Sequence, residues 1–236
     1  MASNPLREIA SISRDIRKIG WEKLPRQIPR ACLIFCNIRA HRNSESPKES
    51  LKIAKLAKYL NCEIFLIVDA TLEEFIDAMR HFITEVTEFL LIFTAANRII
   101  TGKKTETPSI QFKDDSVDPE LMYDLINCKN PASRVFLLMD AIDHPSHWDL
   151  SKFPMNRNGI YVMSAYPDSS QKETIQFDSA MNGVFSVALS KSIKANPDGT
   201  LASISKEVDK DLTPFGQKTY VSSHPSNLAE SSQFLI

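Results

Sequence analysis

The chain of 236 residues is predicted to form an α/β domain with a mostly parallel central sheet that is flanked by helices. Two observations support this fold class. Several short segments consist almost entirely of consecutive apolar residues, which is typical of strands that are covered on both faces. The segments between them place apolar residues three or four positions apart, as amphipathic helices do. Because strands that alternate with helices need crossover connections, we expect neighbouring strands to run parallel.

Residues 1–30 are predicted to form an amphipathic helix and a linker that pack on the rest of the domain. The isoleucines of this segment recur at steps of three and four residues and therefore share one helical face: Ile9, Ile12, Ile16 and Ile19. Asn4 suits the position that caps the helix, and Gly20 suits its end. Burial of this face against the core is the expected role, and binding of a partner is the alternative.

Residues 31–236 are predicted to form the α/β domain itself. The predicted strands follow one another at 31–38, 63–69, 88–94, 134–139, 159–165 and 217–223. The predicted helices begin near residue 51 and then occupy 71–86, 118–129, 181–195 and 201–212. Thr71 and Glu74 match the capping box that marks the start of a helix. The segment 96–116 suits a hairpin or an irregular excursion, and the residues from His224 onwards suit a loop.

Composition makes several classes of partner improbable. A net charge of −1 and a pI near 6.5 give no electrostatic reason to expect nucleic acid or an anionic membrane surface. The longest apolar runs fall far short of the roughly 20 residues that span a bilayer, and no signal peptide is evident, so we expect a cytoplasmic protein. The scattered cysteines are expected to be reduced, and we expect neither a structural metal nor a cofactor: Cys32, Cys36, Cys62 and Cys128.

From Ala31 onwards, the order of these segments resembles the caspase-like superfamily of cysteine peptidases, most closely the metacaspases and bacterial orthocaspases. "ACLIFCN" resembles the first strand of the family, and "EIFLIVDATLEEF" resembles its second strand and the helix that follows. "LLIFT" resembles the strand that leads to Ser-Gly-His-Gly, and "RVFLLMDA" the strand that leads to Asp-x-Cys. "YVMSAYPDSSQKE" and "MNGVFSVAL" resemble the next strand and a helix start. The resemblance implies a caspase-like sandwich.

The same resemblance implies that both members of the catalytic dyad are missing. Ser-Gly-His-Gly falls on Thr94 to Asn97, which places the histidine position at Ala96 and the former oxyanion loop at Asn97. Asp-x-Cys falls on Asp140 to Ile142, which places the nucleophile position at Ile142. The separation of 46 residues, 142 minus 96, agrees with the spacing expected for the family. Alkyl side chains supply neither a nucleophile nor an ionisable proton, so hydrolysis by this dyad is excluded.

Other residues near the former site are candidate remnants or replacements of it. The resemblance relates Asp140 and Asp168 to the acidic pocket that receives basic side chains in metacaspases, although both also suit strand ends and loop caps. Cys36 ends the first strand of the domain and is expected to be a structural thiol. His144 and His147 are weak metal candidates, because a His-x-x-His pair without a third ligand is unspecific, and a polar surface loop is the simpler interpretation.

These observations support a catalytically inactive, caspase-like pseudopeptidase as the leading hypothesis. It would bind an active metacaspase or a peptide segment and regulate it. The alternative is a cysteine endopeptidase of altered chemistry that uses Cys36 or the loop with His144 and His147. A third and weaker interpretation is a scaffold that has no remnant pocket.

Overall fold

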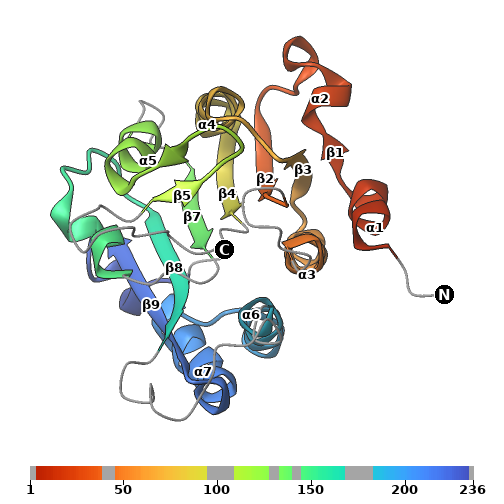
Figure 1. Ribbon diagram of the computed structural model, residues 1–236. Coiled ribbons are helices and arrows are strands. Elements are labelled where there is room, and N and C mark those ends of the chain that lie inside the picture. Colours follow the sequence, from red (N-terminus) through yellow and green to blue (C-terminus); the bar gives the residue numbers. More distant parts are fainter. Residues whose placement is uncertain are drawn as a thin grey trace.

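The computed structural model describes residues 4–38, 46–94, 109–127, 133–139, 145–167 and 183–233 (Figure 1). Its centre is a seven-stranded sheet with the strand order β1-β3-β2-β4-β7-β8-β9. The sheet consists of β1 (Arg14–Asp15), β2 (Ile28–Cys36), β3 (Glu63–Val68), β4 (Val86–Thr94), β7 (Arg134–Met139), β8 (Ile160–Pro167) and β9 (Gln217–His224). All neighbouring pairs are parallel except β8 and β9. The predicted α/β class with a mostly parallel sheet is confirmed.

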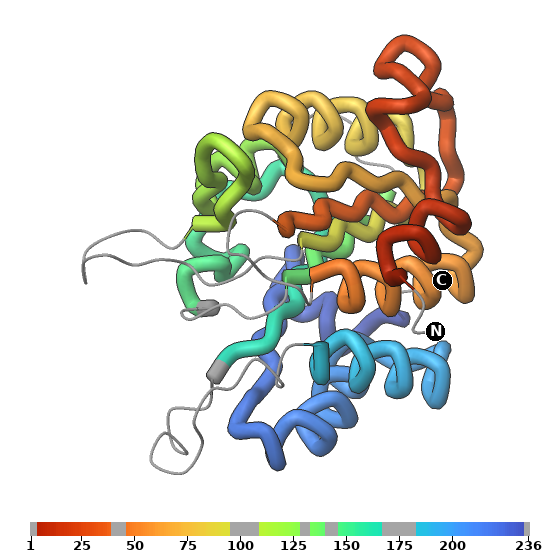
Figure 2. The backbone as a smooth tube through the Cα atoms, turned by 45° about the vertical axis from the view of Figure 1, so that its right-hand side comes forward, coloured from red at the N-terminus to blue at the C-terminus, as the bar shows by residue number. Residues whose placement is uncertain are grey.

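Helices cover both faces of the sheet (Figure 2). One face is covered by α1 (Pro5–Ile12), α3 (Ser46–Tyr59), α6 (Val184–Ala195), α7 (Leu201–Leu212) and α8 (Leu228–Ser231). The other face is covered by α2 (Ile16–Ile19), α4 (Leu72–Glu85), α5 (Pro119–Ile126), the hairpin of β5 (Ile110–Gln111) and β6 (Ser116–Val117), and the short 3-10 helices η2 (Pro145–Trp148) and η3 (Leu150–Lys152). Two further 3-10 turns are η1 (Trp21–Lys23) and η6 (Thr213–Phe215). The sheet therefore separates two apolar cores, which we call the α3 side and the α4 side.

Successive residues of the central strands alternate between the two cores. In β2, Leu33 and Phe35 lie in the core of the α4 side, whereas Cys32, Ile34 and Cys36 lie in the core of the α3 side. This arrangement explains why the strands are apolar at every position. Burial on both faces is the pattern that distinguishes them from strands with one wet face.

Local signals placed several elements correctly. Thr71 accepts a hydrogen bond from the Glu74 N–H, and the Glu74 carboxylate accepts one from the Thr71 N–H, so the predicted capping box is present at the start of α4. The bounds of β7 and α7 coincide with the predicted 134–139 and 201–212. The excursion in the middle of the chain contains the β5–β6 hairpin. The C-terminal loop prediction was incomplete, because the segment after His224 contains the short helix α8.

The prediction of one continuous N-terminal helix was wrong. The helix ends at Ile12, Ser13 is extended, and Arg14–Asp15 pair with β3 as β1 before α2 begins at Ile16. Because β1 lies at the edge of the sheet, α1 and α2 fall on opposite sides of it. Ile9 and Ile12 accordingly pack on the α3 side, and Ile16 and Ile19 on the α4 side.

The physical reason is the unpaired edge of β3. An exposed strand edge offers backbone groups that another segment can pair with, and Arg14 and Asp15 take that place in register with Phe65 and Leu66. The side chain of Asp15 then caps α2 by accepting a hydrogen bond from the Arg17 N–H at 3.0 Å. The segment 1–30 also contributes the start of β2 at Ile28, so the proposed boundary at residue 30 falls inside a strand.

Candidate functional site at the carboxyl edge of the sheet

The carboxyl ends of four neighbouring parallel strands form one edge of the sheet, where ligand sites of open α/β folds collect. Phe35 of β2 is in register with Thr94 of β4, Thr94 with Met139 of β7, and Met139 with Ser164 of β8. We call this edge, with the ends of β2, β4, β7 and β8, the inner rim. The end of β3 beside it, with α2 and the start of α4, is called the outer rim.

Most of the predicted site residues lie outside the described residues: Ala96, Asn97, Asp140, Ile142, His144 and Asp168. The structure does describe the strand ends that lead to them. Ala96 follows Thr94 by two residues in the sequence, and Ile142 follows Met139 by three. Thr94 and Met139 are direct neighbours in register. The two strands that the resemblance relates to the dyad are therefore adjacent and parallel, and they end at the same level of the sheet.

The inner rim contains buried polar atoms that have no hydrogen-bond partner among the described residues. They are the hydroxyl oxygens of Thr94 and Ser164 and the side-chain oxygen of Asn37. Thr94 and Ser164 face the α4 side, since they continue the alternation of Ile92 and Val162. The amide nitrogen of Asn37 donates to the Gln111 carbonyl at 3.1 Å and so directs this side chain to the same side. Buried polar atoms without a described partner also occur elsewhere in the chain, as in Ser50 and Trp148. Each such group costs about 1–3 kcal/mol and is therefore unfavourable for folding alone.

These groups offer hydrogen bonds but no catalytic base. A hydroxyl becomes a nucleophile when an adjacent base accepts its proton, and neither Thr94 nor Ser164 contacts such a group among the described residues. The sequence did contain a signal for this set, because "FCN", "LIFT" and "YVMS" each place a small polar residue at the end of an apolar run. Asn37 and Ser164 are not among the site residues predicted from the sequence.

Cys36 lies on the opposite face of the inner rim, under α3. Its side chain is fully buried. Burial raises the pKa of the Cys36 thiol to about 11, and the nearby charges of Asp69 and Glu49 act in the same direction against a lowering contact with Ser50. The reactive form of cysteine is the thiolate, so at neutral pH Cys36 is a protonated core residue. Cys32 and Cys62 are also free and buried, as predicted, and Cys128 lies outside the described residues.

The outer rim is closed by Arg17, which sequence patterns did not single out. Its guanidinium donates to the carbonyls of Val68 at 2.8 Å and Asp69 at 3.0 Å, and to both carboxylate oxygens of Glu74 at 2.6 Å. The hydrogen bonds to Glu74 raise the pKa of Arg17, and those from Arg17 lower the pKa of Glu74. Asp69 in turn accepts from the Ile38 N–H at 2.7 Å. A set of charge-assisted hydrogen bonds of this kind has a structural role.

The residues after β7 that the structure describes are also structural. His147 lies exposed in η2. Asp149 accepts hydrogen bonds from the Ser151 N–H at 3.0 Å and the Ser222 hydroxyl at 3.2 Å, and so fixes η3 to β9. Burial alone would raise the pKa of Asp149, but the bonds from Ser151, Ser222 and Tyr220 outweigh it and the pKa is lowered. Within the described ranges, no three His, Cys, Asp or Glu side chains form a group that could hold a metal ion.

Comparisons with known proteins add no identification. No protein-family model matches the chain, and no curated protein matches it. None of the helices that the structure describes has the length and apolar character required to cross a bilayer. The motif order and the geometry of the sheet edge are therefore the basis of the functional proposal.

Proposed function

We propose that this chain is a catalytically inactive, caspase-like pseudopeptidase that acts by binding. The observation that supports it most is the register of Thr94 with Met139, because a dyad needs its two strands adjacent and ending at one level. A chain with Ala96 and Ile142 beyond these strands keeps that arrangement but has lost its chemistry. A caspase-like sandwich is part of this proposal, and the mostly parallel sheet flanked by helices is compatible with it.

The partner in this proposal is an active metacaspase relative or a peptide segment in the cytoplasm. The inner rim supports a binding role, since its unsatisfied buried oxygens can accept or donate hydrogen bonds to an ordered loop or ligand. Asp140 and Asp168 would add charge-assisted hydrogen bonds to a basic side chain of that partner. The terminal strand β9 lies at one end of the strand order, where a second chain can dock.

The first experiment measures hydrolysis by the full chain. Fluorogenic peptides that end in Arg, Lys or Asp are supplied with and without calcium, and we expect no turnover above a buffer blank. Cys36→Ala and the matched control Cys62→Ala, a second buried thiol, are assayed beside it. Turnover that Cys36→Ala abolishes and Cys62→Ala preserves would replace the proposal with the endopeptidase of altered chemistry.

The second experiment measures association. Pull-down and size-exclusion chromatography use active metacaspases from the same cell, and their peptidase rates are recorded with and without this chain. We expect a complex at micromolar concentrations and a changed rate. Absence of both would remove the regulatory role and leave an inert scaffold as the better account.

A further inference from the structure

The N-terminal arm lies at one edge of the sheet, and its role is independent of the proposed function. We use this name for residues 4–19, which contain α1, β1 and α2. α1 packs on α3, β1 pairs with β3, and α2 lies beside β1 and β3. Figures 1 and 2 show these three elements together at one side of the molecule. The arm is therefore joined to the domain through the elements at this edge.

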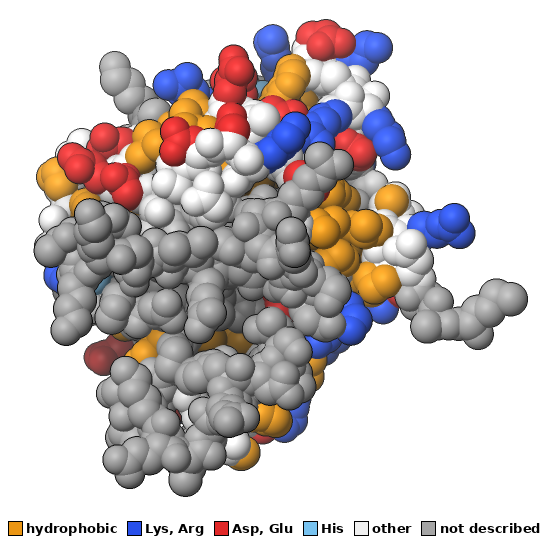
Figure 3. Space-filling view, in the orientation of Figure 1, with side chains coloured by type: hydrophobic (Ala, Val, Ile, Leu, Met, Phe, Trp, Pro, Cys, Tyr) orange, Lys and Arg blue, Asp and Glu red, His pale blue; other side chains and the backbone are white. Residues whose placement is uncertain are grey.

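Two buried isoleucines, a short ladder and partly exposed ion pairs fasten the arm. Ile9 and Ile16 are fully buried on opposite faces of the sheet, and the ladder of β1 with β3 has two residue pairs. Figure 3 shows charged side chains of both signs gathered over α2 and α4, at the top of the view. Ion pairs between partly exposed side chains each contribute little to the attachment: Glu8 with Lys55, Arg14 with Glu63, and Arg17 with Glu74. These contacts can open together while the ladders between the other six strands stay paired.

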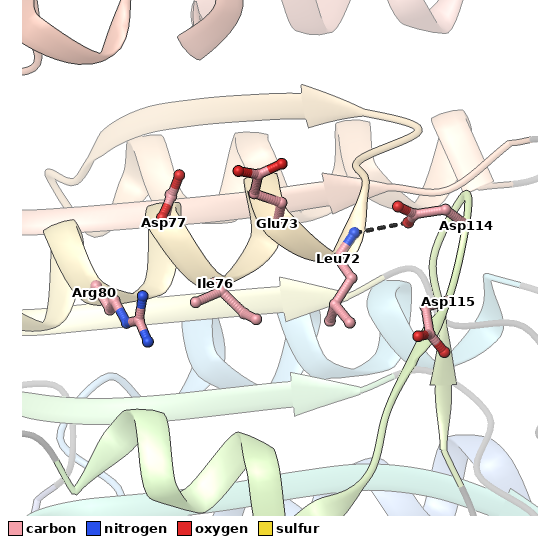
Figure 4. A pocket seen from close by; sticks show the side chains of 7 residues that line it. All are labelled: Leu72, Glu73, Ile76, Asp77, Arg80, Asp114 and Asp115. Carbon is pink, nitrogen blue, oxygen red and sulfur yellow. Dashed lines mark hydrogen bonds between the residues drawn. The ribbon is translucent and has the colours of Figure 1, made fainter.

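The surface that receives the arm is fixed by other parts of the chain. β3 pairs with β2 along its whole length, from Glu63 to Val68. The start of α4 is held by its own capping box and by Asp114, which accepts a hydrogen bond from the Leu72 N–H at 2.8 Å (Figure 4). The edge of β3 and the start of α4 therefore keep their positions when the arm leaves, and they stay complementary to the arm of another copy.

The turn that joins the arm to β2 has the features of a hinge. Gly20 has a φ of +83°, a conformation that glycine adopts and other residues rarely do. The three residues of η1 that follow it are exposed, whereas Leu24 is buried in the core of the α4 side. Residues 20–23 are therefore a short exposed turn between two anchored segments. A short hinge that closes in one special backbone conformation is the kind that invites exchange of a segment between copies.

We propose that the N-terminal arm exchanges between two copies of this chain, so that each arm docks on the sheet edge of the other copy. The occupant of the edge is the same in both states, so exchange keeps every contact of the arm and changes the conformation of the hinge. In the exchanged dimer, Arg17 of the second copy satisfies the carbonyls of Val68 and Asp69 and pairs with Glu74. Each copy thus completes the outer rim of the other.

The first test changes the hinge in the full chain. Light scattering after size exclusion measures the dimer at about 100 μM, since its fraction grows with concentration. Alanine is strained at the positive φ of the closed turn, whereas the opened hinge can take another conformation. We therefore expect Gly20→Ala to raise the association constant at least about tenfold, because both hinges of a dimer are relieved. The matched control is Gly159→Ala, which meets a similar φ of +77° outside the hinge and is expected to leave association unchanged.

A cross-link shows whether the dimer is an exchanged one. Arg14→Cys with Glu63→Cys replaces two side chains that meet at 3.2 Å between β1 and β3, and a short bismaleimide joins the new thiols. The link connects two chains in an exchanged dimer and one chain in the monomer. Denaturing electrophoresis of the isolated dimer is therefore expected to show a covalent dimer, and the isolated monomer a single chain. The unsubstituted protein, treated in the same way, controls for its own cysteines.

A longer hinge gives a second test of opposite sign. Insertion of Gly-Ser-Gly-Ser after Trp21 lets the turn close more easily, so the dimer fraction is expected to fall below that of the unsubstituted protein. Thermal melts establish that all variants are folded. The proposal is overturned if Gly20→Ala associates no more strongly than Gly159→Ala, if the isolated dimer contains links within single chains, or if the insertion leaves the dimer fraction unchanged.

Discussion

The outer and inner rims belong to the same edge of one sheet, yet their polar groups are in different states. At the outer rim, Arg17 satisfies the last carbonyls of β3 and pairs with Glu74. At the inner rim, the hydroxyls of Thr94 and Ser164 are buried and have no hydrogen-bond partner among the described residues. One end is closed by a segment of the chain that lies far away in sequence. At the other end, which we call open, the two hydroxyls have no partner among the residues that the structure describes.

We interpret the satisfied polar groups of the outer rim as structural and the unsatisfied ones of the inner rim as candidates for the proposed binding function. Folding favours the satisfied arrangement of the outer rim, and apolar residues at the inner rim would fold at least as well. Natural chains keep such locally unfavourable choices mainly at functional sites. The open end coincides with the strands that lead to Ala96 and Ile142, so geometry and motif order indicate the same region.

The largest expected effect follows from removal of the segment that closes the outer rim. Deletion of residues 1–20 removes Arg17 and the fully buried Ile9 and Ile16. Burial of each isoleucine contributes about 1.5–3 kcal/mol, and about 1 kcal/mol shifts the melting temperature of a domain of this size by roughly 2–4 °C. We expect the melting temperature to fall by about 10 °C or more, measured by calorimetry or circular dichroism.

Single substitutions serve as the control for this deletion. Ile9→Ala and Ile16→Ala lie on opposite sides of the sheet, so their effects on the free energy of unfolding are expected to add. An unchanged melting temperature of the truncated chain would mean that the segment is free, and it would then become a candidate for partner binding.

The N-terminal segment also shows how far the sequence can predict the fold. The capping box predicted the start of α4, because it depends on neighbours in the sequence. The spacing of the isoleucines predicted one buried helical face, but Ile9 and Ile16 are buried on opposite sides of the sheet, and Ile12 and Ile19 are half-buried. The break at Ser13 depends on the free edge of β3, some 50 residues away, and Arg17 finds its partners at a similar separation. Local periodicity does not contain such information.

The second effect concerns the thiol of Cys36, which lies on the α3 side of the inner rim. Because the pKa of Cys36 is raised to about 11, its thiolate fraction at pH 8 is expected to be roughly a hundredfold below that of an exposed cysteine. Iodoacetamide labelling, resolved by mass spectrometry of peptides, should therefore be at least that much slower in the native chain than in urea. Cys62, whose pKa is also raised to about 11 by burial, is the matched control. Rapid labelling of Cys36 alone would favour the endopeptidase hypothesis.

The third effect is the pH dependence of the stability that the pair of Arg17 and Glu74 contributes at the outer rim. Hydrogen bonds from Arg17 lower the pKa of Glu74 below its unfolded value of about 4.3. The pair therefore contributes stability that is present above that pH and is lost as the pH falls through the lower folded pKa. Since both side chains are partly exposed, we expect Glu74→Gln to lower the free energy of unfolding by about 1 kcal/mol at pH 7.

Urea denaturation between pH 3 and pH 7 measures this contribution. The difference in the free energy of unfolding between the wild type and Glu74→Gln should become smaller as the pH falls from 7 to 3. Glu63→Gln is the matched control, because its pair with Arg14 is about half exposed on both sides and should contribute less. A difference between the chains that stays constant over the whole range would show that Arg17 closes the outer rim through Val68 and Asp69 rather than through Glu74.

The smallest expected effect is the most direct test of the open rim. Thr94→Val keeps the shape of the side chain and removes a buried hydroxyl that has no partner among the described residues. We expect the free energy of unfolding to stay equal or to rise by up to about 1 kcal/mol. The matched control is Thr71→Val, which deletes a hydroxyl that caps α4 and should lower stability by about 1 kcal/mol.

If the comparison between the rims is correct, Thr94→Val keeps or raises the free energy of unfolding, whereas Thr71→Val lowers it. Should Thr94→Val destabilise the chain as much as Thr71→Val, the Thr94 hydroxyl would have a partner in the chain, and the inner rim would be as closed as the outer one. If stability is kept while the binding of an active metacaspase weakens, the hydroxyl contributes to recognition. That combination would locate the proposed binding function at the end of β4, two residues before Ala96.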